Sequence, residues 1–143
     1  MSSSTQMMLG ALVTILGMII HTAVLFAGRE VLDLAATALG DARFWIYWTS
    51  TTVVVVLVVL FGHAIQITMW ALMLVKMRAI EDFDDAIYFA LVTTTTLGYG
   101  DITLGRKYRI FGATGALSGL VTFALSTAFL AENLEYELRI TTG

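Results

Sequence analysis

The sequence contains no cysteine and no proline among its 143 residues. Without cysteine there can be no disulfide bond, no thiol chemistry and no metal site built from thiolates. Without proline, no helix of this chain can carry a proline kink. Charged residues are scarce too, at 13% of the chain against about 25% in ordinary soluble proteins. No basic tract is present, so we expect no nucleic-acid partner.

Apolar residues, by contrast, are abundant. They make up 58% of the chain, where soluble domains have roughly 45–50%, and the mean hydropathy is +0.84. The formal net charge of −3 says little, because lipid would cover most of the surface. The composition predicts an integral membrane protein, of one domain with a few spans, with the lipid bilayer as its surroundings. Together with the apolar runs described next, it leads us to expect an all-α, multi-pass membrane protein.

Three long apolar runs predict three transmembrane helices. The first run, Met7–Gly28, has about the 20 residues that a bilayer requires. The second extends from Phe44 to about Val75 and is long enough to span with a tilt. Aromatic residues at its start, and Trp70 towards its end, are expected to anchor it at the membrane surface. The third run is Tyr108–Leu134. The start "MSSSTQ" lacks the positive charge of a signal peptide, so we expect the first run to be retained.

The segment that follows the first run, "REVLDLAATALGDARFW", has polar residues at helical spacing. Glu30, Asp33, Thr37 and Asp41 recur at steps of three and four residues. Two interpretations stay open: an amphipathic helix lying on the membrane surface, and a plain connecting helical turn. Either way, residues 1–43 form a unit that precedes the remaining two runs.

Between the second and third runs, the sequence predicts a short helix followed by a polar loop. Asp82 can cap the helix, with Asp85 three residues further on in an arrangement like a capping box. The apolar part, "AIYFALV", is too short to span a membrane, so the chain would enter partway and return through "TTTTLGYGD". Irregular backbone at membrane depth is tolerated only where protein buries it or where it lines a watery cavity. The loop therefore indicates a pore.

The loop has the chemistry to replace the water around a cation. Backbone carbonyls can do this if they all point inward. Aligning them requires left-handed conformations, which glycine adopts without steric cost, and Gly98 and Gly100 stand at alternate positions. Thr96 can add a hydroxyl oxygen, and Asp101 could tie the loop to the short helix. Because one such strand cannot encircle an ion, several copies of the chain are required.

The stretch "TTLGYGD" resembles the selectivity filter of potassium channels, with leucine where valine or isoleucine is commoner. The surroundings match as well: an outer helix, a short pore helix, the filter and an inner helix, over residues 44–135. The chain is similar to small prokaryotic-type members of this pore-domain family, with an additional N-terminal span. The resemblance implies three transmembrane helices, one re-entrant pore helix, a homotetramer, and a location in an inner or plasma membrane. Residues 136–143 would form a short cytoplasmic tail.

The resemblance also implies roles for individual residues. Potassium ions would be coordinated by Thr96, Leu97, Gly98, Tyr99 and, at the outer mouth, Gly100, with no organic cofactor. The chain departs from the family at two positions: Val92 stands where some members have an acid, and Phe89 replaces a tryptophan that often braces the filter tyrosine. We therefore expect Thr93 to offer a hydroxyl to Tyr99, with Asp101 and Thr95 as further supports. These departures concern the rigidity of the filter more than its preference for potassium.

The inner helix carries Gly112, Gly115 and Gly119, which favour close helix packing. The alternative, from the position of Gly119 in the family, is a gating hinge. Alignment on Gly119 predicts that Phe123, Thr127 and Ala131 line the cavity below the filter. If that alignment is off by one residue, Ala124 and Ala128 face the cavity instead.

Several polar residues lie inside the apolar runs: His21, His63, Gln66, Ser118, Thr122 and Ser126. Polar groups within a membrane suggest function. The simpler expectation is a satisfied interhelical hydrogen bond for the two histidines and the glutamine. For the serines and the threonine, it is a bond to the backbone of their own helix.

Passive, potassium-selective conduction is the function that these features predict. No nucleophile–base pair, phosphate loop or zinc-ligand spacing is present, so we expect no enzyme. A potassium uptake transporter would need four fused pore units with degraded filters, whereas this chain has one intact unit. A non-conducting or modifying subunit of another channel remains the alternative.

No span is rich in arginine, so we expect no conventional voltage sensor. The family places the outer end of the filter outside the cell, although the positive charges of the loops favour the opposite orientation.

Overall fold

The structure of the protein is a computed structural model that describes residues 1–38 and 44–142. Over these residues the backbone forms four α-helices and no strand. They are α1 (Ser3–Ala38), α2 (Phe44–Lys76), α3 (Phe83–Thr94) and α4 (Arg109–Thr142). In this described part, three helices, α1, α2 and α4, are long and apolar enough to cross a membrane. The expected all-helical, multi-pass membrane architecture is thus confirmed.

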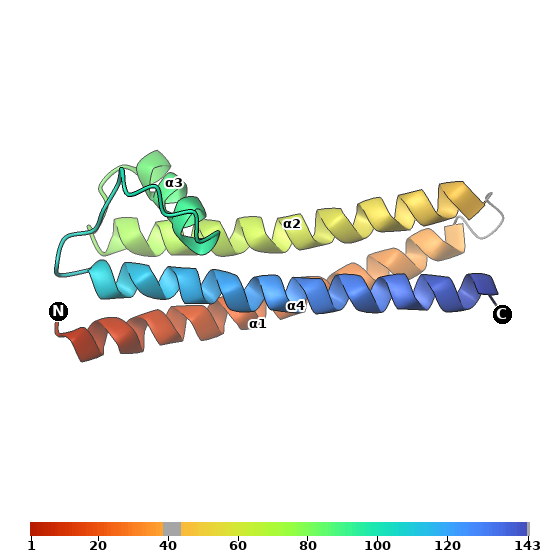
Figure 1. Cartoon of the computed structure of the whole chain (residues 1–143), viewed down its shortest axis with the longest axis horizontal. Helices are drawn as coiled ribbons and strands as arrows, with labels where there is room; N and C mark the ends of the chain where they lie inside the picture. Colours follow the sequence, from red (N-terminus) through yellow and green to blue (C-terminus); the bar gives the residue numbers. More distant parts are fainter. Residues whose placement is uncertain (39–43, 143) are drawn as a thin grey trace.

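The three long helices lie side by side, and α3 packs against α2 and α4 near one end of the bundle (Figure 1). We call this end the loop end, because the polar loop after α3 lies there. The chain starts at the loop end, and α4 ends at the opposite end (Figure 1). Consequently α1 and α4 run in the same direction, and α2 runs against both.

The helices α1 and α4 keep a constant register along the bundle. Side-chain hydrogen bonds join Gln6 to the backbone of Ile110, His21 to Ser126, and Arg29 to Glu132. These pairs are 104, 105 and 103 residues apart in sequence, as expected for parallel helices in contact over their length. The first helix is therefore an integral part of the bundle.

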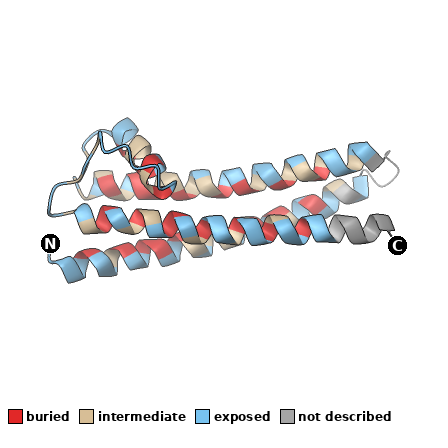
Figure 2. Cartoon of the chain, in the orientation of Figure 1, coloured by how far each residue is buried: buried red, intermediate tan, exposed pale blue. Residues whose placement is uncertain are grey.

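Two apolar clusters form the core. The cluster at the loop end holds α3 against the long helices and consists of Val13, Trp70, Ala71, Leu74, Ala86, Ala90 and Phe111. The second cluster lies towards the opposite end and consists of Leu25, Leu32, Val55, Val59 and Phe129. Buried residues follow the facing sides of the helices, and exposed residues follow their outer sides (Figure 2). The expectation that Trp70 anchors α2 at the membrane surface is wrong, because its side chain is 2% exposed and packs on Phe111.

The segment after residue 28 differs from the expected surface helix. It continues α1 without a break to Ala38. Leu32 is buried in the second cluster, and Arg29 is paired with α4, so packing keeps this segment in the bundle. The polar residue Asp41 of the expected helix lies outside the described residues. At the other terminus, α4 continues as a helix through Thr142, where we expected a short tail.

The start of α3 is capped as expected. Asp82 has an extended backbone, with φ −83° and ψ 139°, and precedes the first helical residue. Its Oδ1 accepts hydrogen bonds from the backbone N–H groups of Asp84 at 2.9 Å and Asp85 at 3.0 Å. This satisfies donors that the first turn of a helix leaves free, and the acids also favour the positive end of the helix dipole.

Candidate functional site

The loop that follows α3 has an unusual alternation of backbone conformation. The φ angles of Thr96, Gly98 and Gly100 are +60°, +56° and +78°, all in the left-handed region. Leu97 and Tyr99, which lie between them, have no positive φ. An ordinary strand alternates the direction of its carbonyls, and a left-handed residue at every second position is what brings successive carbonyls to one side. Positive φ is a genuine outlier for a β-branched residue such as Thr96, at a cost of about 1–3 kcal/mol.

The glycines are required here by conformation and not by crowding. No atom lies within 4 Å of the position that a Cβ would take on Gly98 or Gly100. The loop is also open in a single chain, since Leu97 is 55% exposed and Tyr99 is 68% exposed. Such a backbone, strained at one end and uncovered along its length, is a candidate ion-coordinating site.

Backbone hydrogen bonds fasten the beginning of the loop to the C-terminal end of α3. The N–H groups of Leu97 and Gly98 both donate to the carbonyl oxygen of Val92, at 3.0 and 3.2 Å. The N–H of Thr96 donates to the carbonyl of Thr93 at 3.0 Å. Although Val92 has no acidic side chain, its carbonyl is thus a main anchor of the loop. The hydroxyl of Thr95 turns back to its own helix and donates to Leu91 O at 2.7 Å.

A side-chain hydrogen bond fastens the end of the loop to α3. The hydroxyl of Tyr88 donates to Oδ2 of Asp101 at 2.6 Å. This bond lowers the pKa of the Asp101 carboxyl, because it favours the ionised form. It is also the main cause of the raised pKa of Tyr88, since the hydroxyl must keep its proton to donate. Sequence reasoning named Asp101 but missed Tyr88, although a tyrosine inside an otherwise apolar "AIYFALV" was an available signal.

The expected hydrogen bond between Thr93 and Tyr99 is not among the bonds of the described residues. The Thr93 side chain faces α4 instead, with its methyl Cγ2 3.4 Å from the position of a Cβ on Gly115. Phe89 packs against the cluster at the loop end, which includes a tryptophan from another helix. Trp70 of α2 donates from Nε1 to Ser118 Oγ at 3.3 Å and is buried in the cluster that holds α3.

The inner-helix glycines face α3 and the chain that follows the loop. A Cβ on Gly112 would lie 2.5 Å from Leu104 Cδ1, and one on Gly115 would be in ordinary contact with Thr93. A Cβ on Gly119 would lie 1.8 Å from the carbonyl oxygen of Thr94 and 2.9 Å from its Cα. Backbone atoms cannot give way as a flexible side chain can. Close packing therefore accounts for Gly119, whereas Gly115 has room for a methyl group. The hinge at Gly119 stays a prediction.

The predicted cavity-lining residues lie on exposed positions of α4. Phe123, Thr127 and Ala131 are all exposed in the single chain, and the Phe123 ring packs on His63 with centroids 4.5 Å apart. Ala128, from the alternative register, lines a cleft of about 500 Å³ between α1 and α4. Neighbouring residues on a helix point about 100° apart, so Thr127 turns away from that cleft.

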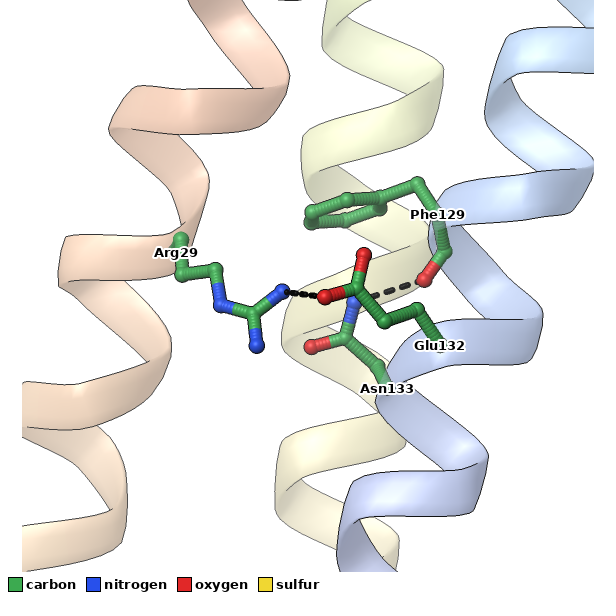
Figure 3. A network of polar contacts seen from close by, with 4 residues as sticks. All are labelled: Arg29, Phe129, Glu132 and Asn133. Carbon is green, nitrogen blue, oxygen red and sulfur yellow. Dashed lines mark hydrogen bonds and ion pairs between the residues drawn. The ribbon is translucent and has the colours of Figure 1, made fainter.

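The cleft ends at a polar network (Figure 3). Arg29 of α1 forms an ion pair with Glu132 of α4, with Nη1 and Oε1 2.7 Å apart. One residue further along α4, the Asn133 amide donates to the backbone carbonyl of Phe129 at 2.7 Å. The ion pair is partly exposed, so it adds little net stability to the contact between the two helices.

The polar residues inside the spans make the interhelical bonds that we expected for His21, His63 and Gln66. Both histidines bond Ser126, and Gln66 donates to Ser118 Oγ at 2.7 Å. Thr122 bonds the backbone of its own helix, which confirms that expectation. The same expectation for Ser118 and Ser126 is wrong, because their hydroxyls face partners on neighbouring helices.

Helical spans around a re-entrant helix and a left-handed loop are the architecture of a pore-loop ion channel. Residues 53–136, more than half of the chain, match the family model described as "Ion channel", and the chain belongs to this family. It is similar to human "Potassium voltage-gated channel subfamily A member 4", with 41% identity over 59 residues, which are 39% of this chain and 9% of the relative. Against the rabbit "Potassium voltage-gated channel subfamily A member 5", the identity is 44% over 55 residues, 36% of this chain and 9% of the relative. No solved structure matches.

Proposed function

We propose that the protein conducts potassium ions passively and selectively across a membrane, through a pore that four identical copies form around one axis. The observation that carries this proposal is the left-handed backbone at Thr96, Gly98 and Gly100. In this conformation the carbonyls of the loop are available to replace the hydration shell of a cation. The similarity to proteins named as potassium channels supports potassium as the cation.

The proposed ion sites follow from the order of oxygens along the loop. The hydroxyl and carbonyl of Thr96 form the innermost site, and the carbonyls of Leu97, Gly98 and Tyr99 form the next ones. Gly100 stands at the mouth. The C-terminal carbonyls of α3 carry the negative end of its dipole, which favours a cation near Thr94 and Thr95.

Several copies are needed because one loop cannot surround an ion. The single chain leaves the loop and one side of α4 uncovered, including Leu120, Phe123 and Thr127. Assembly around an axis would bury these residues against their equivalents or against the water of a central cavity. This assigns α4 as the inner helix and α2 as the outer helix, with α1 outside both.

Ion flux into liposomes that contain only the purified full chain tests the proposal. We expect potassium influx, a reversal potential that follows potassium in potassium–sodium mixtures, and a tetrameric mass in detergent. Equal permeability to sodium would overturn the selectivity. Flux that arises only when a second channel chain is added would identify a modifying subunit instead.

A further inference from the structure

Two histidines from different helices converge on one serine in the middle of the bundle. Nε2 of His21 lies 2.9 Å from Ser126 Oγ, and Nε2 of His63 lies 3.1 Å from the same atom. The ring centroids are 4.8 Å apart. With both rings neutral, the hydroxyl can donate its single proton to one nitrogen and accept a proton from the other. This cluster joins α1, α2 and α4 at one point, and the proposed conduction does not use it.

The surroundings of His21 disfavour an added proton. His21 is 0% exposed, and its Nδ1 has no hydrogen-bond partner among the described residues. The backbone of α2 closes off that nitrogen, because a Cβ on Gly62 would lie only 2.7 Å from it. A protonated His21 would therefore bury a charge, with the backbone of Gly62 beside its second N–H group. Burying a charge carries a large cost in an apolar interior.

The surrounding helices offer no compensating carboxylate. The acid on α4 nearest in sequence to Ser126 is Glu132, more than a turn away and already paired with Arg29. The other charged or titratable residues on the described helices are, besides Arg29, Glu30 and Asp33 on α1; Tyr47 and Lys76 on α2; Asp84, Asp85 and Tyr88 on α3; and Arg109, Glu135, Tyr136, Glu137 and Arg139 on α4. All of them except Tyr88 stand in the end regions of their helices. The nearest charge to either ring would be the other ring, and two protonated imidazoles repel.

We propose that His21, Ser126 and His63 form a proton-responsive clamp, which holds α1 against α4 while both rings are neutral and releases α4 when they take up protons. Phe123, whose ring packs on His63, links the clamp to the proposed cavity. Ser126 is the neighbour of Thr127, which the proposed function places on the pore. Released α4 can move at this level, so acid increases the current. The effect on current rests on the proposed function, whereas the movement of the helix does not.

The helix movement is measured directly on the full chain. The protein has no native cysteine, so the substitutions Thr22→Cys and Leu125→Cys can carry a pair of spin labels. These residues line opposite sides of the cleft between α1 and α4. In lipid discs, we expect the label distance to lengthen between about pH 8 and about pH 5, the range in which histidine titrates. An unchanged distance overturns the proposal.

Flux measurements with matched variants assign the response to the cluster. If the released state binds a proton about tenfold more tightly than the clamped state, the clamp equilibrium shifts about tenfold over this range. We expect about that increase in potassium flux for the parent. The double variant His21→Gln with His63→Gln keeps amide donors for Ser126 but cannot titrate, so its flux should stay low at both pH values. Ser126→Ala removes the shared partner, so its flux should be high at both.

Thr122→Val is the matched control, because the Thr122 hydroxyl bonds only the backbone of its own helix. It should keep the acid response of the parent. A parent-like response in the double glutamine variant, or loss of the response in Thr122→Val, overturns the clamp. A parent chain without flux at any pH, but with a label distance that lengthens in acid, would overturn the proposed function and leave the clamp intact.

Discussion

The carbonyl oxygen of Thr94 occupies the place where a side chain on Gly119 would begin, with only 1.8 Å between that oxygen and the position of a Cβ. Thr94 is the last residue of α3, and Gly119 lies on the inner helix. The contact sets how closely the end of α3, and therefore the start of the loop, approaches α4. Because of this contact, experiment can decide whether Gly119 serves close packing or a hinge.

Gly119→Ala should displace α3 and impair both stability and conduction. Forcing a methyl group against backbone costs about 1–3 kcal/mol or more. Gly115→Ala is the control, since its Cβ would meet Thr93 at an ordinary 3.4 Å and alanine favours a helix by about 1 kcal/mol over glycine. Thermal unfolding in detergent compares the two. If Gly119→Ala is as stable as Gly115→Ala and only its gating changes, the hinge interpretation is the better one.

Gly98→Ala should abolish potassium selectivity without unfolding the protein. The φ of +56° disfavours any side chain, although the space around the residue is open. Gly105→Ala is a matched control, because Gly105 is equally uncrowded but has no positive φ. Reversal potentials in potassium–sodium mixtures should shift for the first variant and not for the second. If Gly98→Ala keeps its selectivity, the left-handed conformation of the loop is not the cause of that selectivity.

Tyr88→Phe should raise the pKa of the Asp101 carboxyl towards its ordinary value. The hydrogen bond that lowers this pKa contributes fully to stability above pH 3.8, the ordinary pKa of an aspartate carboxyl. Its contribution is lost as pH falls through the lowered pKa of Asp101. On the alkaline side, it is present below 10.0, the ordinary value for tyrosine, and is lost as pH rises through the raised pKa of Tyr88. The structure therefore predicts a loop end that is fastened between these limits.

Carboxyl NMR of Asp101 checks this prediction. The titration midpoint of Asp101 should be higher in Tyr88→Phe than in the parent, and Phe89→Leu, one position along α3, should leave it unchanged. The same midpoint in the parent and in Tyr88→Phe would show that the hydrogen bond does not control the carboxyl.

Gln6→Leu should destabilise the start of α4. Oε1 of Gln6 accepts from the backbone N–H groups of Ile110 at 3.1 Å and Phe111 at 3.4 Å, and the side chain is 2% exposed. Leucine would leave two donors of the first turn without this partner, and the loss costs about 1–3 kcal/mol for the buried N–H of Phe111. Gln6→Glu keeps an oxygen acceptor at the positive end of the helix dipole and should unfold at a higher temperature than Gln6→Leu. Equal melting temperatures for the two variants would argue against the cap.

The sequence alone could predict the three spans and the left-handed glycines of the loop, because both depend on local properties. Run length and hydropathy decide whether a helix can cross a bilayer, and alternate glycines permit left-handed backbone. The direction in which a side chain points depends on how each helix is rotated against its neighbours. An aromatic residue such as Trp70 has the same local sequence whether it faces lipid or α3. For the same reason, sequence could not show that Thr93 faces α4, or that Ser126 joins two histidines.

Thr127→Cys tests the side of α4 that faces the pore. A water-soluble thiol reagent applied from the end opposite the loop should modify this cysteine in the conducting state and reduce the current. Thr127 and Ala128 are both exposed in the single chain, but they point about 100° apart around the helix, and Ala128 faces the cleft against α1. Ala128→Cys is therefore the control and should react slowly. The absence of native cysteine ensures that any reaction reports the introduced site. Reaction at positions 124 and 128, with protection at 127, would place the pore on the other register and separate Phe123 from the cavity.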